Sequence, residues 1–330
     1  MEQVFDTPIT RLFGIRHPIL VGGMMWLSDA SLVAAVVNAG AMGFVTALSF
    51  AEPKRFREEL RVCRAATGGK PFGVNLTISS RLTDHATLRA LLDVALEEEV
   101  RHFETAGSPP PGEMLDAIHG VGGVLIHKVP KIRHALTAER LGVDAVTLVG
   151  MEEGGHPGAN DLPTFVNGAF ALSRLSIPLV VGGGIGSGRQ IAAALAMGAA
   201  GVTMGSFFTV AEEVTAHRAY KERIVEVDEN CSTTALSSLT GTWRVLINDT
   251  VREVQKREAA GASRYEDFSD LIRGTLTREV CYGTGDWNAG MVSLGPAAGF
   301  ADRISPAAEL VEQLMREAAS AADRLGRLRV

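Results

Sequence analysis

One histidine lies in a loop whose composition suits contact with a ligand. His156 follows Glu153-Gly154-Gly155 and precedes Pro157-Gly158, shortly after an apolar run that ends at Gly150. Glycines let the backbone approach a ligand closely, and imidazole titrates near neutral pH. His156 is therefore a candidate for removing a proton from carbon or for stabilising an anionic substrate. The alternative is an ordinary loop histidine, because the chain contains eight histidines.

A lysine also stands where core residues are expected. Lys128 ends the apolar run Val124-Leu125-Ile126-His127, and lysine is rarely buried without an anionic partner. An anionic group of a bound ligand would be such a partner. An internal salt bridge with Glu104 or Glu152 is the alternative. Asn75, which also ends an apolar run, either hydrogen-bonds a ligand or caps its own strand.

Two glycine-containing segments could hold a phosphate group. Residues 182–188 read Gly-Gly-Gly-Ile-Gly-Ser-Gly, and Gly205-Ser206 lies further along the chain. The first segment begins at the end of the apolar run 178–183 and the second ends the run 202–206, which are the last two of eight such runs in the chain. Many α/β barrels bind phosphate after their last two strands, close to helix N-termini. The alternative is that the glycines only form tight turns. A dinucleotide-binding motif is less well supported, because no acidic residue ends the following run.

Eight short apolar runs are predicted to be strands, and amphipathic segments between them are predicted to be helices. The runs mostly lack polar alternation, which is typical of parallel strands covered on both faces. The predicted strands span 18–23, 42–47, 72–77, 102–105, 123–128, 145–150, 178–183 and 202–206. The predicted helices span 29–39, 53–66, 87–98, 112–119, 131–141, 164–175 and 188–197.

This alternation predicts an α/β fold, a closed (β/α)8 TIM barrel, rather than an open sheet, which typically has about five to seven strands. Active sites of such barrels lie at the carboxyl ends of the strands, so we expect Gly184, Lys128 and His156 to lie around one mouth. Residues 1–208 and 302–330 are predicted to form the barrel domain, with 306–324 as its last helix. Residues 209–301 are predicted to be a helical insertion, with helices at 210–224, 244–260 and 265–271, that covers the site; a surface or dimerisation element is the alternative.

Composition excludes several classes of protein. The formal net charge of −6 and the pI near 5.8 argue against nucleic-acid binding, which relies on clustered Lys and Arg. The three cysteines lack metal or disulfide spacing, and no histidine pair has metal spacing, so we predict no metal. The first ten residues do not resemble a leader, and no run is apolar enough to span a bilayer. We expect a cytoplasmic protein that acts on a small-molecule substrate and has no membrane partner. If the protein assembles, we expect a homodimer.

Several motifs, in the same order along the chain, resemble the nitronate monooxygenase (2-nitropropane dioxygenase) superfamily from about Phe13 to Phe208. A weaker similarity follows around 285–292. The motifs are Pro-Ile-Leu-Val-Gly-Gly-Met-Met-Trp at 18–26, Asn-Ala-Gly at 38–40, Pro-Phe-Gly-Val-Asn-Leu at 71–76, Glu-Thr-Ala-Gly at 104–107, His-Lys-Val at 127–129 and Gly-Gly-His-Pro-Gly at 154–158.

The resemblance implies that FMN binds at the top of the barrel. His156 matches the active-site histidine of the family, which assists deprotonation or binding of the nitro compound. The positions that match the family's contacts to the ring and ribityl chain are Gly23, Met24, Asn75, Lys128 and Gly150. The positions that match its phosphate contacts are Gly183, Gly184, Gly205 and Ser206.

The activity implied first is oxidation of alkyl nitronates with O2 to a carbonyl product and nitrite. NAD(P)H:quinone reductases and FMN-dependent enoyl-acyl-carrier-protein reductases share the scaffold, and the motifs look closest to the quinone-reductase-like branch. A flavin-binding barrel without turnover is a third hypothesis. Two departures from the family affect substrate choice: Val149 stands where relatives often carry an acidic residue, and the segment 282–287 is short. Trp26, Trp287 and Met291 either line a substrate pocket or pack in the core.

Overall fold

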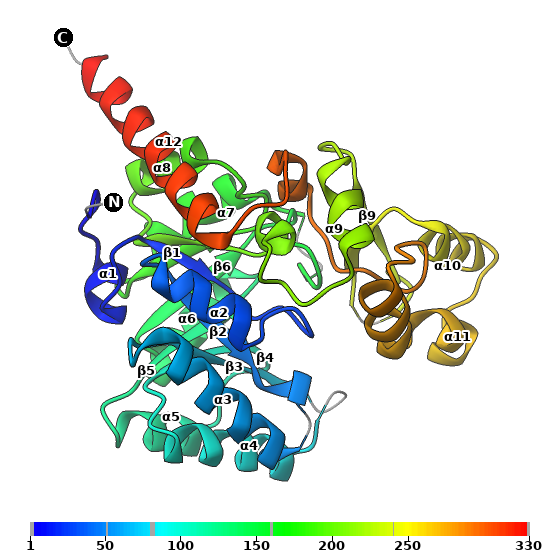
Figure 1. Ribbon diagram of the computed structural model, residues 1–330, viewed down its shortest axis with the longest axis horizontal. Coiled ribbons are helices and arrows are strands. Elements are labelled where there is room, and N and C mark those ends of the chain that lie inside the picture. The colour runs from blue at the N-terminus through cyan, green and yellow to red at the C-terminus, as the bar shows by residue number, and fades with distance from the viewer. Residues whose placement is uncertain (1–2, 51, 80–82, 159–160, 240, 329–330) are drawn as a thin grey trace.

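A closed barrel of eight parallel strands forms the centre of the molecule (Figure 1). The computed structural model describes residues 3–50, 52–79, 83–158, 161–239 and 241–328. Neighbouring strands follow sequence order, and β8 pairs with β1 to close the barrel. The strands are β1 Ile19–Val21, β2 Met42–Thr46, β3 Gly73–Ile78, β4 His102–Gly107, β5 Val124–Val129, β6 Ala145–Val149, β7 Leu179–Gly182 and β8 Gly201–Met204. Each predicted apolar run coincides with one strand, so the TIM-barrel prediction is confirmed.

Seven helices follow the first seven strands and surround the barrel. They are α2 Ala30–Asn38, α3 Pro53–Thr67, α4 His85–Glu97, α5 Gly112–His119, α6 Ile132–Leu141, α7 Thr164–Leu172 and α8 Gly188–Met197. Local sequence fixes several of their ends. The Asp29 side chain accepts hydrogen bonds from the first turn of α2, while Gly142 and Gly198, in the left-handed conformation, end α6 and α8.

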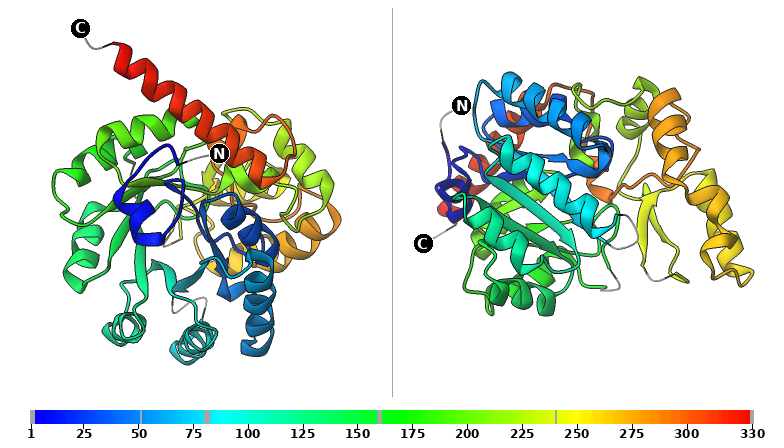
Figure 2. Two further views of the ribbon diagram at one scale, coloured as in Figure 1. Left: turned by 60° about the vertical axis from the view of Figure 1, so that its left-hand side comes forward. Right: turned by 90° about the horizontal axis from the view of Figure 1, so that it is seen from below.

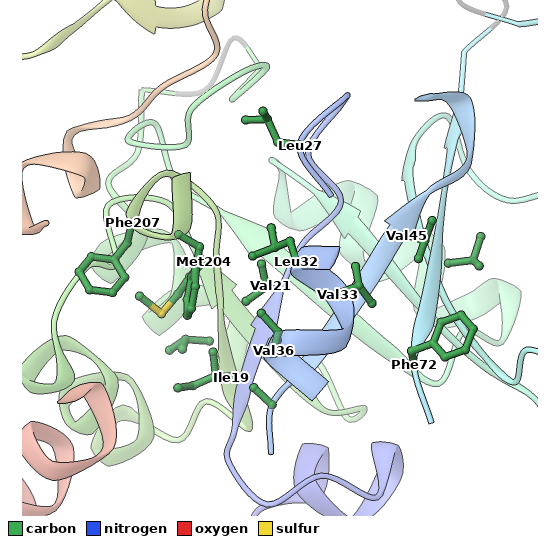
Figure 3. Packing of buried hydrophobic residues seen from close by; sticks show 14 of the residues in the cluster. Ile19, Val21, Leu27, Leu32, Val33, Val36, Val45, Phe72, Met204 and Phe207 are labelled. Atoms are coloured by element: carbon green, nitrogen blue, oxygen red, sulfur yellow. The ribbon is translucent and has the colours of Figure 1, made fainter. Parts of the chain in front are cut away.

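The core has two layers because each strand is buried on both faces. Outside the barrel, Ile19 and Val21 pack with residues of α2, and Figure 3 shows this layer continuing to Met204 and Phe207. Inside the barrel, residues such as Leu20 form a separate cluster. This arrangement explains why the strands read as continuous apolar runs.

A short helix that the sequence reading did not predict closes one end of the barrel. Helix α1, Pro8–Phe13, buries Ile9 and Phe13 in the interior cluster. Thr7 caps it, and the Thr10 side chain bonds back to the Thr7 backbone. This capping pair before an apolar residue was the available signal. Because α1 lies at the amino ends of the strands, their carboxyl ends remain for the site.

The segment after β8 contains a small sheet as well as helices. Its elements are η2 Ser206–Val210, α9 Arg218–Val225, β9 Ser232–Ala235, β10 Trp243–Leu246, α10 Asp249–Ala259, η3 Tyr265–Asp267, α11 Ser269–Ile272, the π-helical η4 Leu276–Tyr282 and η5 Pro296–Phe300. Strands β9 and β10 pair antiparallel. The helix predicted at 210–224 starts too early, because α9 begins at Arg218. The helix predicted at 244–260 also starts too early, because 244–246 belongs to β10 and α10 begins at Asp249. Thr233 and Thr234 lie opposite Val245 and Arg244, and β-branched residues favour a strand over a helix there.

This segment has its own hydrophobic cluster and projects to one side of the barrel (Figures 1 and 2). Val245 of β10, Val251 of α10 and Phe268 are buried in it. Helix α12, Ala307–Arg327, then returns and packs against α8 and α2. Its Glu317 carboxylate accepts a hydrogen bond of 2.9 Å from the backbone N–H of Gly188. Among the described residues, no helix is long and apolar enough to cross a membrane.

Candidate active site

Strand register brings polar side chains together inside the carboxyl end of the barrel. Asn75 on β3 lies opposite Glu104 on β4, and Lys128 lies two positions further along the neighbouring strand β5. In a parallel barrel, residues level with one another on adjacent strands face the same side. These three residues from three strands therefore share one region of the barrel mouth.

Glu104 is the centre of this region, although the sequence indicated it only as one alternative partner of Lys128. Its fully buried carboxylate accepts a hydrogen bond of 2.5 Å from the Asn75 amide and one of 3.0 Å from the backbone N–H of Gly23. Its other oxygen, Oε2, has no hydrogen-bond partner among the described residues. A buried carboxylate oxygen without a donor is costly, so this atom is available to a ligand.

Lys128 pairs with a carboxylate that the sequence reading did not name. Its Nζ lies 3.5 Å from Glu153 Oε1. Burial alone would lower the pKa of Lys128, but the nearby carboxylates of Glu104 and Glu153 outweigh burial and raise it. The suggested partner Glu152 instead binds the backbone N–H and hydroxyl of Thr164. Lys128 is thus a stable cation at the mouth.

The glycines after β6 and β7 form one tightly packed turn. Gly183 and Gly184 have φ angles of +93° and +72°, which side chains rarely adopt. A Cβ on Gly150 would lie 2.2 Å from the backbone nitrogen of Thr164, and one on Gly183 would lie 2.9 Å from its Oγ1. The Thr164 hydroxyl reaches the carbonyl oxygens of residues 182 and 183 at 2.7 and 2.8 Å. Only glycine fits at these positions.

The first turn of α8 is already supplied with acceptors from within the protein. Gln190 Oε1 accepts from the N–H groups of Gly186 and Ser187, and its amide donates to the carbonyl of Gly184. Gly188 N–H is bound to Glu317. The N–H groups of Gly186, Ser187 and Gly188 at the start of this helix are therefore occupied by protein acceptors.

The loops after β1 and β8 meet beside that turn. A Cβ on Gly205 would lie 3.5 Å from Met24 Sδ, so the two residues are in ordinary contact distance. The Ser206 hydroxyl accepts a hydrogen bond of 2.8 Å from the backbone N–H of Gly295, and a hydroxyl that accepts can also donate one hydrogen bond. The predicted phosphate residues thus come from two neighbouring strand ends.

His156 carries an exposed imidazole that is stacked on a tryptophan from the segment after β8. Its ring centroid lies 5.0 Å from that of Trp243, with 25° between the planes. The surrounding protein removes part of its hydration and lowers the pKa of His156, and the charge of Lys128 acts in the same direction. The imidazole is therefore neutral near neutral pH and can accept a proton.

The backbone beside His156 is bound to the same tryptophan-bearing strand. Gly155 N–H donates to Arg244 O at 2.9 Å, and Arg244 N–H donates to Gly155 O at 2.6 Å. The Trp243 indole N–H donates to Ser293 Oγ at 2.8 Å. Trp243 was not among the residues predicted for the site, because the residues after it fit the start of a helical pattern; the aromatic and β-branched run after Gly241 is the signal for a strand.

The three residues considered for a substrate pocket have packing partners. Met291 is buried in the cluster of the segment after β8. The Arg223 guanidinium lies 4.6 Å from the ring centroid of Trp287. Trp26 has a φ of +64°, and a Cβ on Gly274 would lie 2.5 Å from its indole. Trp26 thus joins the β1 loop to the segment after β8.

No group of three or more metal-ligating side chains lies together in the part of the chain that the structure describes. The sequence profile of the nitronate monooxygenase family matches residues 6–317, which is nearly the whole chain. The chain belongs to the nitronate monooxygenase family.

Relatives of known name cover almost the full length of this family member. A nitronate monooxygenase from Pseudomonas aeruginosa is 30% identical, over 93% of this chain and 98% of its own. A (3aS,4S,5R,7aS)-5-hydroxy-7a-methyl-1-oxo-octahydro-1H-indene-4-carboxyl-CoA dehydrogenase from Mycobacterium tuberculosis is 28% identical, over 94% and 96%. The structure of FabK from Thermotoga maritima has a TM-score of 0.88 and 31% identity, covering 98% of this chain and 99% of that chain. The chain is therefore an oxidoreductase of this family.

Proposed function

We propose that this protein is an FMN-dependent nitronate monooxygenase with His156 as its catalytic residue. Two nitronate anions and one O2 would give two carbonyl compounds and two nitrite ions, which balances atoms and charge. The observation that carries the proposal is a neutral, solvent-accessible imidazole within the electrostatic reach of Lys128. A neutral base beside a cation suits formation and binding of an anion.

The residues at the barrel mouth fit a flavin mononucleotide. The cation of Lys128 suits the edge of the ring that becomes negative on reduction, and the unpartnered oxygen of Glu104 suits a ring or ribityl donor. In this proposal Gly23, Met24, Asn75 and Gly150 lie along the ring and ribityl chain. The phosphate would be held by Gly183, Gly184, Gly205 and Ser206. FMN, when bound, supplies the electron acceptor that the side chains lack.

The proposed role of His156 is to accept a proton at an unprotonated ring nitrogen. A nitroalkane loses this proton from the carbon beside the nitro group and becomes a nitronate. The positive charge of Lys128 favours the anion over its neutral parent. A substrate that is already a nitronate needs only binding, so His156 would matter most for neutral nitroalkanes.

We further propose that residues 209–301 cover the site. Three contacts support this: Trp243 stacks on His156, Gly274 lies against Trp26, and Gly295 is bound to Ser206. These contacts reach the loops after β6, β1 and β8. The domain boundaries at 208 and 302, the cytoplasmic location and the homodimer stay predictions from the sequence.

A second candidate is an NAD(P)H-dependent reductase with a quinone or an enoyl thioester as acceptor. The similarity to a protein named as a carboxyl-CoA dehydrogenase favours thioester chemistry. NADH consumption that depends on added quinone or enoyl thioester would support this candidate over the first.

The first proposal is tested by assaying the flavin-loaded protein with propyl nitronate and with nitropropane. We expect O2 consumption with nitrite release in the ratio of one to two. His156→Ala is expected to retain FMN and to lose about 10²-fold or more of its activity on nitropropane, the magnitude typical of a lost general base. Full activity of the variant would remove His156 from the mechanism, and absence of nitrite from both substrates would reject the proposed function.

A further inference from the structure

Several contacts join His156 to strand β10 rather than to the barrel alone. Residues before it are held by the barrel: Gly150 N–H donates to Gly182 O at 3.0 Å, and Glu153 N–H turns back to Gly150 O at 3.1 Å. From Gly155 onward the partners change, because both backbone groups of Gly155 pair with Arg244. The catalytic loop thus continues the β9–β10 sheet by one residue pair.

The indole of Trp243 is itself fixed in place. Its N–H donates to Ser293 Oγ at 2.8 Å, and Val245, two residues later, bridges to Ser293. The Arg244 guanidinium donates to Met151 O at 2.8 Å, which ties the strand to the start of the same loop. An aromatic ring held at both its backbone and its polar edge is a rigid surface for another ring.

We propose that Trp243 is the positioning residue of His156, so that a residue far along the chain sets the orientation and hydration of the proposed catalytic base. This inference rests on the proposed function of His156. Stacking leaves one face of the imidazole toward solvent, where a substrate would approach, and removes water from the other. The barrel supplies the charge of Lys128, and the β9–β10 sheet supplies the geometry.

Four charged side chains lie on the loop that carries His156 or on the elements that contact it. They are Lys128 of β5, Glu152 and Glu153 of the loop itself, and Arg244 of β10. Of these, Lys128 acts on the pKa of His156. Substitution at Trp243 changes none of them, so a changed pKa would report the loss of the stacked ring and not a changed charge.

The test compares Trp243→Ala, Trp243→Phe and Ser293→Ala by titrating the His156 ring with NMR in the flavin-loaded protein. In Trp243→Ala the ring regains hydration, so its pKa should rise toward the ordinary value. Trp243→Phe should keep the lowered pKa, and Ser293→Ala should give a smaller rise. Phe170→Ala, which removes an exposed ring on α7, is the control and should leave the pKa unchanged.

Kinetics provide the second readout. Loss of orientation should lower kcat on nitropropane roughly tenfold in Trp243→Ala, with KM changed less than about twofold, and Trp243→Phe should restore most of kcat. An unchanged His156 pKa in both Trp243→Ala and Ser293→Ala would overturn the inference. If Trp243→Ala does not fold, Ser293→Ala alone decides. The titration needs no turnover, so it can succeed even where nitrite release fails and the proposed function is wrong.

Discussion

Glu104 connects three of the residues that the sequence singled out. Its carboxylate accepts hydrogen bonds from Asn75 and Gly23, and from the strand next to β5 its charge raises the pKa of Lys128. The sequence reading located Asn75 and Lys128 because polar residues at the ends of apolar runs are conspicuous. Of the two partners that the sequence suggested for Lys128, Glu104 does act on its pKa, but Glu152 does not pair with it. The loop after β6 brings Glu153 to Lys128 instead, and the course of a loop is not encoded in a local pattern.

Substitution of Glu104 should therefore disturb the barrel mouth. Glu104→Gln removes the charge beside Lys128; its carbonyl oxygen can take the place of Oε1, which leaves the amide NH2 group buried at the Oε2 position, where no partner lies among the described residues. We expect a loss of about 1–3 kcal/mol in the free energy of unfolding, as for a disrupted buried polar group, together with weaker FMN retention. Urea unfolding measures the first effect and fluorescence of released flavin the second.

The matched control is Glu113→Gln, which removes an exposed partner of His85. Exposed ion pairs contribute about 0–1 kcal/mol, so little change is expected. Equal stability of the two variants would show that Glu104 does not organise the site.

The barrel strands could be predicted from the sequence, but the small β9–β10 sheet could not. All eight barrel strands were predictable because continuous apolar runs between helical patterns have few other interpretations. The β9–β10 sheet was not, because Trp243–Leu246 is short and runs directly into the amphipathic pattern of α10. Its role beside His156 depends on a contact between segments that lie far apart in the sequence, which no local pattern encodes.

The turn after β7 gives a prediction for a loop element. Gly183→Ala places a side chain at a φ of +93° and within 2.9 Å of Thr164 Oγ1. Gly142→Ala is the matched control, since its φ is +91° and nothing lies within 4 Å of the new Cβ. Both should lose about 1 kcal/mol of stability from backbone strain.

Only Gly183→Ala should lose further stability and FMN affinity, because only its side chain enters the crowded turn that we propose to hold the phosphate. FMN binding constants measured by fluorescence quenching would separate the two variants. Equal binding of FMN by both would place the phosphate elsewhere.

Buried histidines make the whole molecule sensitive to mild acid. Burial lowers the pKa of His17, His102 and His127 from 6.5 to about 4 in each case. The unfolded chain binds protons near pH 6.5 but the folded protein does not, so stability is fully present above 6.5 and falls as pH drops toward 4. At one pH unit below 6.5 the loss should be roughly 1 kcal/mol for each histidine.

Urea unfolding at pH 7.5 and pH 5.5 measures this loss. His17→Gln should show a shallower dependence on pH than the unmodified protein, because one titrating group has been removed. Carboxylates with lowered pKa values change the free energy of unfolding only below about pH 4.5. Between pH 7.5 and pH 5.5 the change in stability therefore comes from the histidines. Stability that is equal at the two pH values would contradict the assignment of neutral, buried imidazoles.

The arrangement of the whole barrel leads to one claim: the carboxyl ends of its strands hold a flavin between Lys128, the glycine turn after β7 and His156. The visible absorbance spectrum of the purified protein, before and after denaturation, tests this claim most directly. We predict the spectrum of a bound oxidised flavin and release of about one FMN per chain on unfolding. A colourless protein that takes up no added FMN would contradict the account.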